Sequence, residues 1–319
     1  MKRLYIISLF IFLFLLSCNK DDLVISPIAE AYLNEVVDVM EANSVNKNSI
    51  NWSDFRKEVF DNAGVPQNIE QTYQGIRWGL VMLGDHHSFF IKPDGSVFFG
   101  DPLECTASTF SAPVVPSTIG YIRINWFSGT NGSDEALAYV QGITDQISTS
   151  DQADLLGWIV DLRGNIGGNL WPMMAAIGPI LGEGVAGYYI YPDNSQVNWG
   201  FSDGSPFLNG NPINQLVNNY QLLTPNPKVA VLLDEEVSKS GEALAISFIG
   251  RENTQSFGSS SCGVSNANVG FVLSDNATLV LTVSNMADRN MNTFGGVVDP
   301  DVVVDTENII QSAIDWIEN

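Results

Sequence analysis

Two adjacent histidines, His86 and His87, stand in the segment Leu83–Ser88 and are the only histidines of the chain. Histidine is the side chain best suited to proton transfer near neutral pH. His87 is therefore a candidate general base. A lone histidine more often has a structural role. This segment therefore indicates catalysis only when it is considered together with the two segments below.

A second segment, residues 229–245, joins an apolar run to an expected helix through a polar turn that contains Ser238 and Ser240. Such a turn exposes a hydroxyl at the carboxyl edge of a sheet, where α/β folds place their sites. The alternative is that either serine only caps the helix, with Glu242 assisting. Taken alone, the segment favours the cap.

A third segment, residues 158–169, runs from an apolar strand into a glycine-rich turn and a helix start. Gly167 and Gly168 would let backbone N–H groups approach an anion, and the helix would add its positive end. The segment lacks the G-x-x-x-x-G-K-[ST] pattern, which argues against a nucleotide phosphate loop. The alternative is a tight strand–helix connection with no ligand.

The elements around these segments alternate between strands and helices from Gly120 onward. Strands are expected at residues 121–124, 156–162, 229–233 and 280–283, and helices at 134–146, 170–181, 240–249 and 306–317. Because the strands are apolar throughout, they predict an α/β fold with a mostly parallel sheet that helices cover on both faces. Residues 26–83 show helical spacing and residues 89–99 resemble a hairpin. We therefore expect a helical N-terminal subdomain over 26–100 and an α/β core over 101–319.

The first residues resemble a secretion leader. Lys2 and Arg3 precede an apolar run, residues 4–16, that is shorter than the ~20 residues needed to span a bilayer. The run ends at a small residue and Cys18, which resembles a lipobox and makes Cys18 the lipidated first residue of the mature protein. We expect a signal peptide over 1–17, a lipidated linker over 18–25 and an outer-membrane lipoprotein of the bacterial envelope, periplasmic or surface-exposed. The alternatives are an ordinary signal peptide and a retained anchor.

Composition excludes several classes of partner and cofactor. The net charge of −22 would repel nucleic acid and anionic lipid, so we expect membrane contact through the lipid on Cys18 alone. Two histidines in total and no Cys-x-x-Cys pair argue against a zinc site, and no cofactor is expected. Cys105 and Cys262 form a disulfide or remain as two free thiols, and their spacing does not decide between these.

In combination, the segments resemble the tail-specific (C-terminal processing) serine peptidases, in particular the branch related to the tricorn protease core. That family carries Leu-x-Asp-x-His-Ser/Thr, Gly-Tyr-Ile-x-Ile, Asp-Leu-Arg-x-Asn-x-Gly-Gly, Ser-x-x-Glu, Phe-Gly and Gly-x-x-Pro-Asp in this order. The matching segments are residues 83–88, 120–124, 161–168, 238–242, 257–258 and 296–301. The resemblance implies a ClpP/crotonase-like core. Only about 30 residues separate Ser88 from Gly120, too few for the PDZ domain that many relatives carry.

The resemblance also implies roles for individual residues. His87 would take the proton from a serine hydroxyl. The backbone N–H of Gly167 or Gly168, with that of the residue after the nucleophile, would form the oxyanion hole. Many relatives use a lysine base after the Phe-Gly turn, and because no lysine follows Lys239 here, the histidine version remains. The supporting candidates are Ser88, Glu242 and Asp301.

The nucleophile departs from the family pattern. The attacking serine usually lies three residues before the glutamate, and that position is Lys239. Ser240 is the favoured replacement, because the helix entrance favours negative charge, and Ser238 is the alternative.

Three functions follow from these observations. The leading hypothesis is an envelope-anchored serine peptidase that cleaves peptide or protein substrates through an acyl-enzyme. The rival is a catalytically inactive peptide-binding lipoprotein on the same fold, which Lys239 favours. A lipoprotein that binds or cleaves glycans through exposed tryptophans and paired carboxylates ranks last, because the tryptophans are more simply core or rim residues. These tryptophans are Trp126, Trp158, Trp171 and Trp199.

Overall fold

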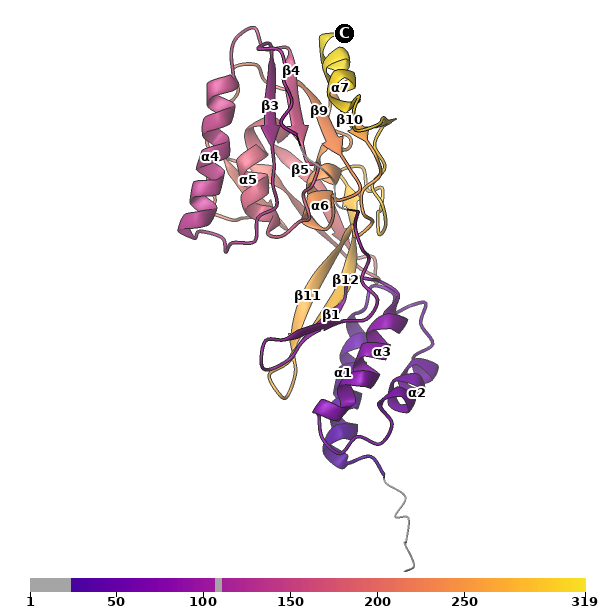
Figure 1. The fold of residues 1–319 in the computed structure, drawn as a ribbon. Coiled ribbons are helices and arrows are strands. Elements are labelled where there is room, and N and C mark those ends of the chain that lie inside the picture. Colours follow the sequence, from indigo (N-terminus) through magenta and orange to yellow (C-terminus); the bar gives the residue numbers. More distant parts are fainter. Residues whose placement is uncertain (1–23, 107–110) are drawn as a thin grey trace, which may run out of the picture.

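Five parallel strands form the sheet that carries the glycine-rich and serine-containing turns (Figure 1). Their order is β13-β10-β9-β4-β3. The strands are β3 (Ile119–Arg123), β4 (Gly157–Asp161), β9 (Lys228–Leu233), β10 (Thr254–Gly258) and β13 (Val302–Val303). Because neighbouring pairs are all parallel, the carboxyl ends of the strands meet at one edge. The turns that follow β4 and β9 therefore lie side by side.

Helices cover both faces of this sheet. They are α4 (Asp134–Ser150), α5 (Leu170–Leu181), α6 (Ser240–Phe248) and α7 (Ile309–Glu318). Trp158 and Val160 of β4 pack in one apolar core with α5 and α6, whereas Ile159 packs in another with α7. This alternation follows from the two-residue period of a strand. The predicted parallel sheet with helices on both faces is confirmed.

A second sheet of eight strands is antiparallel. Its path is β2-β1-β12-β5-β6-β7-β8, and β11 pairs with β12. Its later strands are β5 (Gly184–Ile190), β6 (Gln196–Ser202), β7 (Ser205–Leu208), β8 (Asn211–Pro212), β11 (Asn266–Val272) and β12 (Thr278–Asp288). The sequence pattern predicts none of β5 to β8. Tight turns at Asn194, Asp203 and Asn209, which all have positive φ, join these strands, and β5 pairs with β12, which is distant in sequence.

The N-terminal helices pack on the far end of the second sheet (Figure 1). The elements are α1 (Pro27–Asn43), α2 (Trp52–Ala63), η1 (Glu70–Thr72), α3 (Tyr73–Leu83) and the hairpin β1 (Phe89–Ile91) with β2 (Val97–Phe99). Their core includes Leu33 and Met40 of α1 together with Leu279 and Leu281 of β12. The C-terminal half of the chain therefore completes the core of the N-terminal helices.

Strand β12 links the two parts of the molecule. One end pairs with β1, through Phe89 and Val280, and the other end pairs with β5, through Tyr188 and Ala287. Any residue placed beside β1 is thereby held in a fixed relation to the parallel sheet. His87 stands two residues before β1.

The computed structural model describes residues 24–106 and 111–319. The expected signal peptide and Cys18 lie outside these residues. Across the two described ranges, every helix is too short or too polar to cross a membrane.

Candidate active site

The Asp-Leu-Arg motif at the end of β4 holds the glycine turn by a buried ion pair. Arg163 donates from Nε and Nη2 to the two carboxylate oxygens of Asp161, at 2.9 and 2.6 Å. Asp161 is fully buried and also accepts from the hydroxyl of Tyr121. A two-pronged pair of this kind fixes geometry as well as charge. Its role is to position the turn that follows.

Asn165 ties the glycine turn to the serine turn. Its Oδ1 accepts from the N–H of Gly167 at 2.9 Å, and its carbonyl oxygen accepts from the N–H of Ser238 at 3.0 Å. The N–H of Gly167 is therefore already engaged. Among the described residues, the N–H groups of Gly168 and Ser240 have no acceptor, and both residues line the same cavity. These two amides are the pair available to an oxyanion.

In the turn after β9, the strained backbone position is residue 239 and not Ser238 or Ser240. Lys239 has φ 57° and ψ −118°, and its N–H donates to Glu242 Oε2 at 2.8 Å. A sharp strand–turn–helix with a strained residue at its apex is the arrangement that exposes a nucleophile in α/β enzymes. Here the apex side chain is an exposed lysine that lines the cavity.

The two candidate serines lie on either side of that apex. Ser238 is buried and does not line the cavity. Ser240 lines it, and its Oγ donates to the carbonyl oxygen of Gly168 at 2.7 Å. Of the two serines, only Ser240 therefore lines the cavity, and a backbone carbonyl already engages its hydroxyl.

Glu242 anchors the turn from inside the protein. The carboxylate is buried and accepts from Ser261 Oγ at 2.5 Å and from the N–H groups of Gly263 and Val264 at 2.8 and 3.0 Å. Burial raises the pKa of Glu242, and these hydrogen bonds oppose that rise. Glu242 thus supports the backbone and does not face the cavity.

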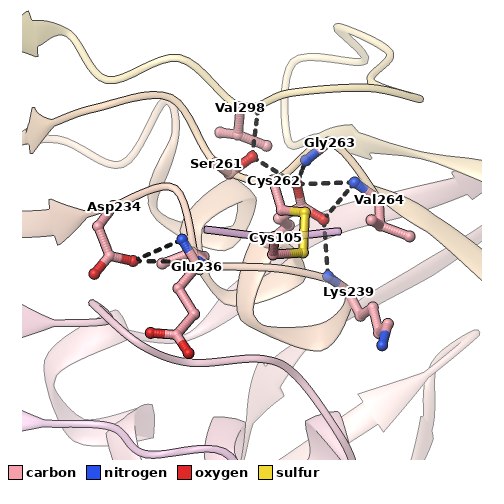
Figure 2. The surroundings of a disulfide bond; sticks show 11 residues. Cys105, Asp234, Glu236, Lys239, Ser261, Cys262, Gly263, Val264 and Val298 are labelled. Atoms are coloured by element: carbon pink, nitrogen blue, oxygen red, sulfur yellow. Dashed lines mark hydrogen bonds between the residues drawn. A yellow bond between two sulfur atoms is a disulfide. The ribbon is translucent and has the colours of Figure 1, made fainter. Parts of the chain in front are cut away.

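A disulfide lies beside this carboxylate. Cys105 and Cys262 are bonded, and the N–H of Cys262 donates to the carbonyl oxygen of Val237. Figure 2 shows Ser261, Gly263 and Val264 next to this bond, with the Lys239 side chain extending away from them. The bond joins the segment after β2 to the loop that holds Glu242.

His87 is positioned by two neighbours. Its N–H and that of Ser88 donate to Asp85 Oδ1, and its Nδ1 lies 2.5 Å from Oδ1 of Asn266. With the amide oxygen facing the ring, Nδ1 carries the proton and Nε2 keeps its lone pair. Burial lowers the pKa of His87 and the charge of Lys239 lowers it further, while the bond to Asn266 acts in the opposite direction. His87 is therefore neutral at neutral pH and able to accept a proton.

A cavity of about 670 Å³ brings the predicted segments together. Its wall includes His87, Gly167, Gly168, Lys239 and Ser240. The aromatic side chains that line it are Phe89, Phe99, Trp126, Trp171 and Tyr189. Residues from the segment after α3, the glycine turn and the serine turn thus meet in one place.

The other predicted residues lie outside the cavity. Ser88 is buried, donates to Asp85 Oδ2 at 2.7 Å and accepts from the N–H of Thr282. Asp301 accepts from the N–H and the hydroxyl of Ser256, between β13 and β10. Both contacts are structural. In the described ranges, no group of three His, Cys, Asp or Glu residues is arranged to hold a metal ion.

Two positioning residues were not predicted. Asn266 lies 179 positions after the histidine that it contacts, and no local pattern connects them. Asp85, in contrast, stands in the same Leu-x-Asp-x-His-Ser segment as His87 and was available from the motif. Trp158 and Trp199 are buried in the core, as expected for structural tryptophans, whereas Trp126 is 52% exposed beside the cavity.

One family model covers more than half of the chain. The family model "Peptidase family S41" matches residues 118–304. The nisin-resistance protein of Lactococcus lactis subsp. lactis is 24% identical over 296 residues, which cover 92% of this chain and 89% of that protein.

Two solved structures share the fold. A lipoprotein from Streptococcus agalactiae has a TM-score of 0.70 at 20% identity and covers 92% of this chain and 98% of its own. The photosystem II D1 C-terminal processing protease has a TM-score of 0.57 at 15% identity, and the match covers 90% of this chain and 97% of that protease. With its parallel sheet, its glycine turn and its strained turn before α6, the chain belongs to peptidase family S41.

Proposed function

We propose that this protein binds a peptide segment in the cavity between the glycine turn and His87, without forming an acyl-enzyme. The observation that carries the proposal is the place of Lys239. It stands three residues before Glu242, at the strained apex of the turn, where the family pattern has the attacking serine. A protonated lysine amine is not a nucleophile.

Neither neighbouring serine replaces the missing hydroxyl well. Ser238 is buried outside the cavity, and its N–H is held by Asn165. The Ser240 hydroxyl donates its hydrogen bond to the carbonyl oxygen of Gly168 and not to His87. A general base and its nucleophile normally lie within hydrogen-bond reach, directly or through one water, and no hydrogen bond joins Ser240 to His87 among the described residues.

The remainder of a peptidase site is retained. His87 keeps a lone pair on Nε2, and the amides of Gly168 and Ser240 are available to an oxyanion. These parts also suit binding of a peptide carbonyl or carboxylate, so they support a peptide as the ligand. The family to which the chain belongs acts on peptides.

Lys239→Ser tests the proposal because it adds the serine hydroxyl that position 239 lacks. We expect the wild-type protein to resist a fluorophosphonate probe, and the variant to gain labelling and slow peptidase activity, because base and oxyanion donors are already in place. Lys239→Ala is the matched control and should gain nothing. The double variant Lys239→Ser with His87→Ala should show neither labelling nor peptidase activity. Failure of Lys239→Ser to react, although it is folded by circular dichroism, would refute a retained peptidase site.

The second candidate is a serine peptidase that uses Ser240. It is favoured by the presence of Ser240 and His87 on the same cavity wall. In that case the wild-type protein reacts with the probe, and Ser240→Ala or His87→Ala abolishes the reaction. If the wild-type protein is labelled and either substitution abolishes the labelling, the protein is a serine peptidase and the binding proposal is wrong.

We also propose that Cys18 is lipidated and anchors the protein to the outer membrane. The leader pattern supports this, because its apolar run ends at Cys18. Cys18→Ala should move the protein from the membrane fraction to the soluble fraction, and an unchanged distribution would contradict the anchor.

A further inference from the structure

The cavity differs from the rest of the molecule in charge. The chain has 36 acidic residues against 14 Lys and Arg, with a net charge of −22. Among the described residues that line the cavity there is no Asp or Glu, whereas Lys239, His86 and His87 are present. An anionic ligand that enters this cavity meets the positive charge of Lys239 and, among the described lining residues, no carboxylate.

Asp101 contacts His86, and neither Asp85 nor Glu242 forms an ion pair with Lys239. Asp85 is occupied by the N–H groups of His87 and Ser88 and by the Ser88 hydroxyl. Glu242 is occupied by the backbone N–H of Lys239 and by the loop that follows Ser261. Within the described part of the chain, the Lys239 ammonium makes no ion pair.

Neutral donors accompany the ammonium. The backbone N–H groups of Gly168 and Ser240, on the same cavity wall, have no acceptor among the described residues. Ser240 is also the first residue of the nine-residue helix α6, whose N-terminal end favours negative charge. An ammonium with two amide donors suits a ligand that has two oxygens and one negative charge.

We propose that the cavity binds the free C-terminal carboxylate of a peptide, with Lys239 as the specificity-determining residue. This rests on the proposed peptide-binding function. The carboxylate pairs with the Lys239 ammonium and accepts from the amides of Gly168 and Ser240. The side chain of the last residue contacts Phe89 and Trp126 of the cavity lining, which favours an apolar last residue.

The test compares two probes that differ in one group. N-acetyl-Gly-Ala-Ala-Leu-Phe is prepared with a free C-terminal acid and as the C-terminal amide, and calorimetry measures both affinities at about 0.15 M salt, where the net charge of the protein is largely screened. We expect the acid to bind at least about tenfold more tightly than the amide. Lys239→Met should remove this preference, and Lys239→Arg should retain most of it. Lys57→Met, at an exposed lysine outside the cavity, should leave it unchanged.

Each outcome distinguishes the two proposals. Equal binding of acid and amide overturns carboxylate recognition but leaves peptide binding intact. A preference that survives Lys239→Met overturns the role of Lys239. Failure of a panel of unrelated peptides, acids and amides alike, to bind the wild-type protein overturns the proposed function itself.

Discussion

Lys239 combines a strained backbone, an anchored N–H and a charge that acts on a neighbouring imidazole. The N–H is held by a buried glutamate, and the imidazole is that of His87. The strain persists because Glu242 is itself fixed by Ser261 and the following amides. The turn therefore presents whatever side chain residue 239 carries to the cavity.

The charge of Lys239 predicts a measurable change in His87. Because burial and Lys239 both lower the pKa of His87, the ring should take up its proton only below the ordinary value of 6.5. Lys239→Met removes a positive charge that lowers the pKa of His87, so this pKa should rise. Asn266→Ala removes a hydrogen bond that raises the pKa, so it should fall. A titration of the imidazole signals by NMR checks both directions. The chain has two histidines, so His86→Gln assigns the signals.

The control for this titration is Lys57→Met, which changes a charge on α2 outside the cavity. It should leave the His87 titration unchanged. A His87 pKa at or above 6.5 in the wild-type protein would contradict the burial described here.

At the scale of elements, the site depends on turns that follow parallel strands. The turn after β4 and the turn after β9 are joined by Asn165, and Gly241 at the start of α6 lies against it. A Cβ added at Gly241 would lie 2.3 Å from the Asn165 carbonyl oxygen, and one at Gly168 would lie 2.2 Å from that of Phe127. These glycines are therefore required for close approach of backbones.

The whole molecule is held together at the site by two long-range links. Strand β12 pairs with β1 and β5, and the Cys105–Cys262 disulfide spans 157 positions. Both links join the N-terminal region to the C-terminal half. Pro102 and Leu103, which precede the disulfide, also line the cavity. The disulfide thus constrains a part of the cavity wall as well as the chain.

Removal of the disulfide should destabilise the protein. Cys105→Ala with Cys262→Ala should lower the free energy of unfolding by about 2–5 kcal/mol, because the unfolded chain loses a constraint across a long loop. Urea denaturation followed by tryptophan fluorescence measures the change. A thiol reductant should lower the stability of the wild-type protein to a similar level and leave the double variant unaffected. An equal loss of stability in the wild-type protein and the double variant would show that the reductant does not act through this disulfide.

The sequence predicted the parallel half of the fold well, because apolar strands and capped helices leave local patterns. The expected helix 170–181 coincides with α5, and the expected helix 240–249 differs from α6 by one residue. The antiparallel sheet was largely missed, since tight turns join β5 to β8 and only the pairing of β5 with the distant strand β12 ties them to the rest of the sheet. The pairing of Cys105 with Cys262 was likewise undecided, because spacing does not report geometry.

By itself, the sequence determined the family, the segments that meet and the absence of serine from position 239, because motif order and residue identity are properties of the chain. Only the tertiary structure decided what those segments do together. It placed Lys239 at the strained apex, engaged Ser240 with Gly168, and brought Asn266 to His87. These relations depend on backbone dihedrals and on contacts between distant strands, which no local pattern encodes.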